Sequence, residues 1–170
     1  GGSRGDHAAG AALPALAGPG AASIACSMRE LSEELGLAAS DEGAVLLRPE
    51  DRNAIVDDKS KWLPLALEDA FPVDRTNIRT LSHRITPPFG PVQFDNAFLH
   101  LHLGSSDDVP DIDLEPQTEF TEVMWAKPQT ILSRWKNHEI KVAPPVVTLL
   151  MEIERTLERT SRDMDAASAD

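Results

Sequence analysis

The chain has no tyrosine, only one cysteine, and far fewer basic than acidic residues. The lone Cys26 excludes an internal disulfide framework and is compatible with a reducing compartment. No stretch approaches the roughly 18 consecutive apolar residues that a membrane-spanning helix needs, and no basic segment precedes a secretory hydrophobic region. The sequence therefore predicts a soluble, intracellular protein, with peroxisome, mitochondrion and cytoplasm left open.

The deficit of basic residues limits the classes of partner that the chain can bind. There are 28 Asp and Glu against 16 Lys and Arg, which gives a formal net charge of -12. A protein that binds long nucleic acids has to neutralise phosphates with Lys and Arg, so this balance argues against such a partner. A small phosphorylated substrate stays compatible, because bound cations and a few local basic groups set the field at a site more than total charge does.

Length and composition predict one domain. The 170 residues, 41% of them hydrophobic, are enough to bury a single core. Residues 1–22 are rich in Gly, Ala and Pro and should form an insertion with loops or a weak helical turn. The main domain is expected over residues 23–160, followed by a flexible tail over residues 161–170.

A cluster of charges within residues 29–37 is the strongest functional signal. The run reads Arg-Glu-Leu-Ser-Glu-Glu-Leu-Gly-Leu. Residues three and four apart share a helix face, so Glu30, Glu33 and Glu34 should project together, and Arg29 can form an ion pair with Glu33. Carboxylates suit Mg²⁺ or Mn²⁺, which makes this face a candidate metal site. The alternative is an acidic helix face that is merely solvated.

The rest of this helix predicts how it is anchored. Its apolar residues recur at helical spacing, roughly opposite the glutamates, and should pack against the core. They are Ile24, Met28, Leu31 and Leu35. Gly36 follows directly and is expected to end the helix in the left-handed conformation.

Residues 29–37 resemble the second half of the signature of the Nudix hydrolases, with every specified position matched. The resemblance implies an α/β fold in which a mixed β-sheet is sandwiched between helices. It also implies hydrolysis of a diphosphate linked to a nucleoside, with Mg²⁺ or Mn²⁺ as cofactor. By the same resemblance, Glu30, Glu33 and Glu34 are metal ligands, and Glu33 is the first choice for the general base.

The first half of that signature departs from the family pattern. Ala21 stands where the family has a glutamate, and Gly1-Gly2 resembles the opening glycine pair but lies further upstream than usual. The family's glycine carbonyl helps to bind metal, which implies Gly2 as a further ligand; a linker is the alternative interpretation of the glycines. The family's first strands precede this pair, so we expect a chain that lacks part of its sheet. An exposed sheet edge would favour association into an oligomer.

Further elements follow from periodicity and turn residues. We expect a short helix within residues 57–69, distorted at Pro64, and a turn-rich loop over residues 104–116. Strands are predicted over residues 78–85, 93–103 and 120–126, and helices over 128–135 and from 144 to about 162.

Several of these segments resemble the long-insert, coenzyme A diphosphatase-like branch of the Nudix hydrolases. They are residues 85–88, 94–95, 119–125 and 144–145. The likeness implies coenzyme A or acyl-coenzyme A as the substrate, although Gln93 stands where the branch often has arginine. Glu119 and Glu122 are the alternative general base or an additional ligand, with an ordinary surface carboxylate as the competing interpretation.

The exposed or buried state of three aromatic residues and the presence of catalysis each have two interpretations. Phe89, Phe94 and Trp125 either stack on a nucleotide base or, as we expect, pack in the core. A Nudix-like binding or regulatory module that has lost catalysis is the alternative function, and Ala21 favours it.

Overall fold

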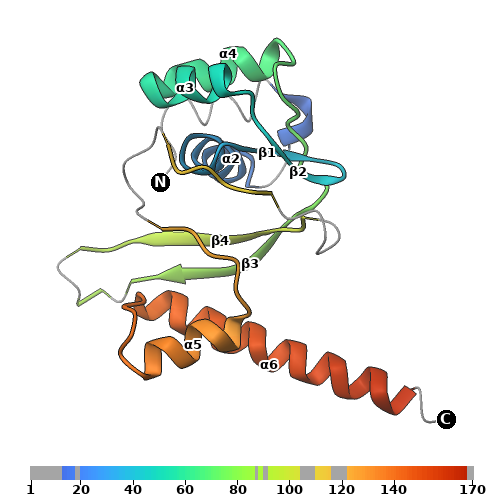
Figure 1. Ribbon diagram of the computed structural model, residues 1–170, viewed down its shortest axis with the longest axis vertical. Helices are drawn as coiled ribbons and strands as arrows, with labels where there is room; N and C mark the ends of the chain where they lie inside the picture. Colours follow the sequence, from blue (N-terminus) through green and yellow to red (C-terminus); the bar gives the residue numbers. More distant parts are fainter. Residues whose placement is uncertain are drawn as a thin grey trace. The chain divides into compact units, whose positions relative to one another are not determined.

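The computed structural model describes residues 13–17, 20–86, 88–89, 92–103, 110–115 and 122–167, and forms two compact units. The first unit covers residues 1–123 and holds helices α2 to α4 with two strand pairs; the second covers residues 124–170 and holds helices α5 and α6 (Figure 1). The α/β class predicted from the sequence is confirmed. None of the described helices is both long and apolar enough to cross a membrane.

The elements of the first unit alternate between short helices and hairpins. In chain order they are the 3₁₀ turn η1 (Pro14–Leu16), α2 (Ala21–Leu35), β1 (Leu37–Ser40), β2 (Gly43–Leu46), α3 (Pro49–Asp57), the 3₁₀ turn η2 (Lys59–Lys61), α4 (Trp62–Leu67), β3 (Ile78–Ile85) and β4 (Asp95–Leu101). The predicted short helix is found as η2 and α4, and β3 has its predicted bounds. The strand expected over residues 93–103 is confirmed as the shorter β4.

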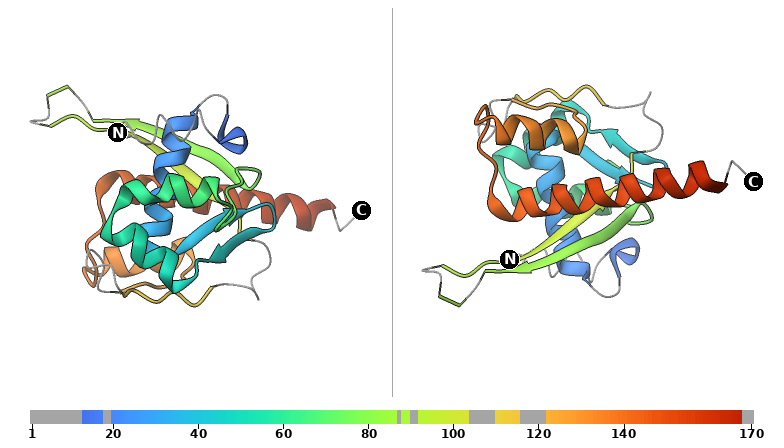
Figure 2. Two further views of the ribbon diagram at one scale, coloured as in Figure 1. Left: turned by 90° about the horizontal axis from the view of Figure 1, so that it is seen from above. Right: turned by 90° about the horizontal axis from the view of Figure 1, so that it is seen from below.

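All described strands pair antiparallel, β1 with β2 and β3 with β4. Where the family resemblance implies a mixed sheet, the described residues form two antiparallel strand pairs. In the first pair, Leu37 lies opposite Leu46 and Ser40 opposite Gly43, and so tight a connection permits only antiparallel pairing. The second pair has an irregularity between Thr80 and Ser82, and its far end projects beyond α2 in both views of Figure 2.

Helix α2 lies against the hydrophobic core of the first unit. Ile24 and Met28 are buried, as the apolar stripe predicted, together with Ala25, whereas Leu31 and Leu35 are half-buried. The core also contains residues of η1, α3, α4 and the loop that follows α4: Leu13, Leu16, Ile55, Trp62, Ala66 and Phe71. Leu13 and Leu16 therefore join the core through η1, which is a helical turn of the kind expected within residues 1–22.

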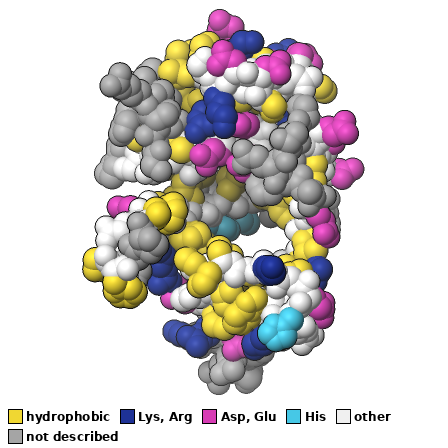
Figure 3. Space-filling model, turned by 90° about the vertical axis from the view of Figure 1, so that its left-hand side faces the viewer, with side chains coloured by type: hydrophobic (Ala, Val, Ile, Leu, Met, Phe, Trp, Pro, Cys, Tyr) yellow, Lys and Arg dark blue, Asp and Glu magenta, His cyan; other side chains and the backbone are white. Residues whose placement is uncertain are grey.

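Gly36 ends α2 as predicted, with φ +64°. In this left-handed conformation, the Gly36 backbone N–H donates a hydrogen bond to the carbonyl of Ser32 at 3.1 Å. Helix α3 begins with Pro49 in its first turn, followed by Glu50 and Asp51, whose charges suit the positive end of a helix. Figure 3 shows Lys and Arg side chains beside Asp and Glu side chains on the surface formed by α3 and α4.

The second unit contains α5 (Pro128–Lys136) and α6 (Pro144–Ala167), which pack together. Both helices begin at the prolines that the sequence indicated, and α6 continues beyond its predicted end near residue 162. Residues 168–170 of the predicted tail lie outside the described part, and the division into residues 1–22, 23–160 and 161–170 stays a prediction.

Two predictions were wrong in the described residues. Residues 122–126 do not form a strand, and the rest of the predicted strand over residues 120–126 is not described. An alternating pattern cannot supply the partner strand whose hydrogen bonds define a ladder. Phe89, Phe94 and Trp125 are exposed rather than core residues, with 89%, 58% and 53% of their surface accessible.

Candidate functional site

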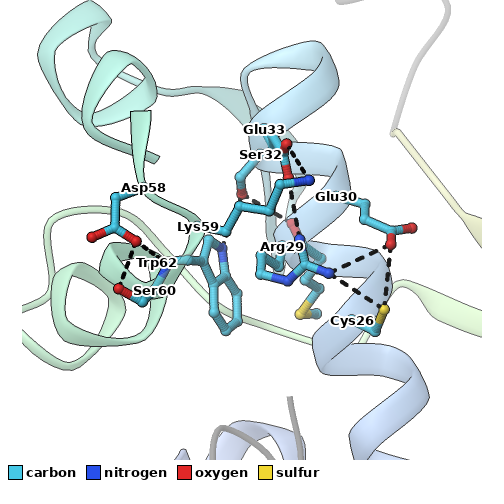
Figure 4. Close-up of polar contacts among 10 residues, drawn as sticks. Cys26, Arg29, Glu30, Ser32, Glu33, Asp58, Lys59, Ser60 and Trp62 are labelled. Carbon is cyan, nitrogen blue, oxygen red and sulfur yellow. Dashed lines mark hydrogen bonds and ion pairs between the residues drawn. The ribbon is translucent and has the colours of Figure 1, made fainter. Parts of the chain in front are cut away.

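Three charged residues of α2, Arg29, Glu30 and Glu33, form a connected group. Arg29 Nη1 lies 3.2 Å from Glu33 Oε2, and Arg29 Nη2 lies 3.5 Å from Glu30 Oε1 (Figure 4). The thiol of Cys26 contacts the same Glu30 oxygen at 3.5 Å. The ion pair between Arg29 and Glu33 expected from helical spacing is therefore present, and Arg29 bridges two of the glutamates.

Glu33 differs from the other two glutamates because it is buried. Only 11% of its side-chain surface is accessible, compared with 52% for Glu30. A second cation reaches it from outside α2, since Lys59 Nζ lies 2.7 Å from Glu33 Oε1. Its two carboxylate oxygens are thus paired with two different cations, Arg29 and Lys59 (Figure 4).

The segment that carries Lys59 is fixed on both sides of that residue. Asp58 Oδ1 accepts hydrogen bonds from the backbone N–H and the hydroxyl of Ser60, at 3.0 and 2.7 Å. These bonds hold the pKa of the Asp58 carboxyl below its usual value. On the other side, Trp62 Nε1 donates to Ser32 Oγ of α2 at 3.1 Å. Lys59 is consequently held next to Glu33 by links made before and after it in the chain.

Sequence reasoning missed Lys59, Ser32 and Trp62 as parts of this group. The run over residues 29–37 shows which side chains share a face of α2, but it carries no information on which other element packs there. The Asp-x-Ser turn at residues 58–60 followed by Trp62 was a signal that this segment is well ordered. It could not indicate that Lys59 faces Glu33.

Arg52 of α3 holds the C-terminal end of α2. Its Nη2 donates to the Glu34 carbonyl at 3.0 Å, and its Nη1 donates to the Asp113 carbonyl at 2.6 Å. Burial lowers the pKa of the Arg52 guanidinium from its usual value. A helix leaves its last carbonyls without partners inside the helix, so Arg52 satisfies one of them. The role of Arg52 was also not predicted from the sequence.

A cavity of about 460 Å³ lies beside Arg52 in the first unit. Its lining includes Gly36, Leu47, Asn53, Asp111, Asp113 and Glu115. Three acidic residues against one arginine make this cavity unfavourable for an anionic substrate such as a diphosphate. The glutamates of α2 are not among its lining residues.

The glutamates fit a hard divalent cation by their chemistry but not by their arrangement. Carboxylate oxygens are the ligands that Mg²⁺ and Mn²⁺ prefer. Among the residues that the structure describes, however, no three His, Cys, Asp or Glu side chains gather closely enough to hold an ion. Glu33 faces two protein cations instead.

Of the remaining predicted site residues, Glu122 lies in the described part of the chain, where it is exposed in an irregular segment. Gly2 and Glu119 lie outside the described part of the chain. Their roles stay predictions.

Comparison with known proteins gives one informative match. No family model matches the sequence, and no curated protein does. A solved structure of a NUDIX hydrolase from Alicyclobacillus acidocaldarius matches with a TM-score of 0.60 and 20% sequence identity. The match covers 79% of this chain and 62% of the other, so the chain spans less than two thirds of that protein. At this level of identity the likeness shows the fold alone: the fold of this chain is similar to that of this NUDIX hydrolase.

Proposed function

We propose that the chain is a Nudix-type hydrolase that cleaves a diphosphate bond in a nucleoside diphosphate-linked compound. The observation that supports this is α2: residues 29–35 lie in the expected helix, Gly36 caps it, and the fold around it is similar to that of a NUDIX hydrolase. The net charge of -12 favours a small substrate over a long polyanion.

The proposal includes Mg²⁺ or Mn²⁺ as cofactor. Glu30, Glu33 and Glu34 would hold it, with the Gly2 carbonyl as a further proposed ligand. A bound divalent cation neutralises phosphate oxygens and lowers the pKa of a bound water molecule. Because Glu33 is paired with Arg29 and Lys59, the side chains have to rearrange before all three glutamates can face one ion.

The chain's own residues would then orient the reacting groups and accept a proton. In the hydrolysis, a water oxygen bonds to one phosphorus, the bridging P–O bond breaks, and the proton of the water passes to a base. Glu33 is the proposed base, and Glu122 or Glu119 is the alternative. Arg29 acts as a positioning residue, since its guanidinium fixes one oxygen of the buried Glu33 carboxylate.

Coenzyme A or acyl-coenzyme A is the substrate that we propose in finer detail. The support comes from the sequence segments at residues 85–88, 94–95 and 119–125; Ile85 pairs with Asp95 at one end of the β3–β4 ladder. Phe89 and Phe94 are exposed there, so aromatic surface is available for stacking on a base.

A Nudix-like binding or regulatory module without catalysis is the second candidate. It is favoured by the two cations at Glu33 and by the absence of a gathered metal-ligand group in the described residues. In this case the ion pairs of Glu33 would only stabilise the fold. The unmodified chain would show no turnover, so a substitution of Glu33 could not change it.

A substrate panel tests the proposal. The full chain is incubated with coenzyme A, acyl-coenzyme A, nucleotide sugars and dinucleoside polyphosphates, each with Mg²⁺ or Mn²⁺, and the phosphate-containing products are identified. We expect cleavage of at least one compound, and a loss of about 100-fold or more in Glu33→Gln, the scale on which positioned acid–base groups contribute. Glu42→Gln is the matched control, because Glu42 is an exposed carboxylate in the β1–β2 turn.

The same panel separates the two candidates. Product formation that survives in Glu33→Gln would remove Glu33 from the mechanism while leaving the hydrolase proposal intact. No product with any compound or cation would favour the binding module.

A further inference from the structure

Lys59 lies where a cation would be expected to bind Glu33. Its Nζ is 2.7 Å from Glu33 Oε1, which is the separation of a direct charge-assisted hydrogen bond. Lys59 belongs to η2 and lies outside the run of residues that carries the Nudix resemblance. The ion pair therefore joins two elements of the first unit, and no position of the signature specifies it.

The placement of Lys59 is built into the fold. The hydrogen bond between Trp62 and Ser32 fastens the start of α4 to α2, and both residues are buried. The Asp58–Ser60 turn fixes the backbone immediately around Lys59. In contrast to this fixed backbone, 59% of the Lys59 side chain is exposed. The ammonium group can therefore leave Glu33 by rotation of its flexible stem, without disturbing the core.

A divalent cation and this ammonium group would compete for Glu33. Mg²⁺ binds carboxylate oxygen at about 2.0–2.1 Å, so an ion on Glu33 would lie only a few ångströms from Lys59 Nζ if the lysine stayed in place. Two like charges at such a distance repel each other, and the repulsion is stronger near a buried group such as Glu33 than in bulk water. Arg29 differs from Lys59 because it is itself largely buried, with 13% of its side chain accessible.

We propose that Lys59 is a resident cation at Glu33 which a divalent metal ion has to displace, so that Lys59 sets the metal affinity of the site. This inference rests on the proposed function, because it assumes that Glu33 is a metal ligand. It assigns Lys59 a role that neither the signature nor the fold implies.

Isothermal titration of the full chain with Mn²⁺ tests this role. The variant Lys59→Met removes the charge and keeps the length of the side chain, and we expect it to bind Mn²⁺ about two- to fivefold more tightly, the effect typical of an exposed ion pair. Lys59→Arg keeps the charge and should retain the affinity of the unmodified chain. Lys61→Met is the matched control, because it removes the same charge from an exposed position of the same turn.

A background without the Glu33 charge makes the test specific. In Glu33→Gln, the further change Lys59→Met should leave the remaining Mn²⁺ affinity unaltered. Equal gains from Lys59→Met and Lys61→Met, or a gain that persists in Glu33→Gln, would overturn the proposal, since either result would reflect net charge alone.

The titration also separates this inference from the proposed function. Binding of Mn²⁺ that depends on Glu33 but is unaffected by Lys59→Met would overturn the role of Lys59 and leave the metal site standing. Absence of Mn²⁺ binding in both the unmodified chain and Lys59→Met would overturn both. Binding that appears only in Lys59→Met would support the resident-cation role.

Discussion

Trp62 Nε1 donates a hydrogen bond to Ser32 Oγ at 3.1 Å, and both side chains are almost completely buried. The carbonyl oxygens of Met28 and Leu37 lie 3.0 and 3.1 Å from the same hydroxyl. A hydroxyl group can accept from Trp62 and donate to a carbonyl at the same time. This contact joins the helix with the three glutamates to the segment that carries Lys59.

The first prediction concerns Ser32→Ala. The substitution leaves the indole N–H of Trp62 buried without its acceptor, so we expect the free energy of unfolding to fall by about 1–3 kcal/mol. Unfolding in urea, followed by tryptophan fluorescence, measures the change.

Ser23→Ala serves as the control because Ser23 is an exposed position of the same helix. Its free energy of unfolding should stay within about 0.5 kcal/mol of the unmodified chain. Similar losses in the two variants would mean that the serines matter for helix α2 itself and not for the contact with Trp62.

Local patterns predicted the elements that depend on a single segment. The spacing of residues 24–35 and the position of Gly36 were sufficient for α2, and alternation was sufficient for the bounds of β3. Prolines at the starts of α5 and α6 located those helices for the same reason, since proline is favoured in a first helical turn. Arg29 and Glu33 met because they are four residues apart in one helix.

Contacts between segments could not be predicted in this way. Lys59 reaches Glu33, and Arg52 reaches the Glu34 carbonyl, only because α3 and η2 pack beside α2. Phe89 was expected in the core but is exposed. Its hydrophobic character shows that the side chain could be buried, but not whether another element packs against it. Packing between elements decides both the partners of Glu33 and the boundaries of the core.

The second prediction concerns Gly36→Ala. Gly36 has φ +64°, and an added Cβ atom would lie 2.7 Å from Arg52 Cδ and 2.9 Å from Arg52 Nε. The left-handed conformation alone costs a residue with a side chain about 1–2 kcal/mol. Displacement of the buried Arg52 should add to this, so we expect a loss of stability larger than about 2 kcal/mol in a urea titration.

Gly20→Ala separates the two contributions. Gly20 has a similar φ of +73°, and nothing lies within 4 Å of the Cβ that alanine would add. It should therefore show the conformational cost without the steric one. An equal loss of unfolding free energy in the two variants would mean that the Arg52 side chain moves away from the added Cβ at little cost.

The third prediction concerns Arg52→Met. Methionine fills a similar volume but cannot donate to the carbonyls of Glu34 and Asp113. We expect faster amide hydrogen exchange in residues 110–115, because their link to α3 is lost. Global stability should fall less than the two hydrogen bonds suggest, since the variant also removes the desolvation cost of a buried charge.

Arg48→Met is the comparison for this experiment. Arg48 also lies at α3, but its side chain is 61% exposed and pairs with Asp51 at 2.6 Å. Its loss should change exchange at the start of α3 and leave residues 110–115 unaffected. Faster exchange of residues 110–115 in both variants would point to loosening of α3 as a whole.

The fourth prediction concerns the pH dependence of stability through Asp58. Hydrogen bonds from Ser60 depress the pKa of this carboxyl in the folded state below its ordinary value of 3.8. A depressed pKa means that ionised Asp58 stabilises the folded state above the unfolded pKa, and that this contribution disappears as the pH falls through the folded pKa. Asp58→Asn can still accept from Ser60 but cannot ionise, so it should lack this acid-dependent part.

Urea unfolding at about pH 6 and about pH 2 measures the effect, since these values lie on either side of the ordinary carboxyl pKa. The difference in unfolding free energy between the unmodified chain and Asp58→Asn should be largest at the higher pH and shrink at the lower one. Ser60→Ala removes the hydroxyl donor and keeps the backbone N–H, so its pH dependence should fall between the two. An unchanged difference across this range would show that Asp58 ionises with the same pKa in both states. The turn around Lys59 would then owe its order to Trp62 and not to the charge of Asp58.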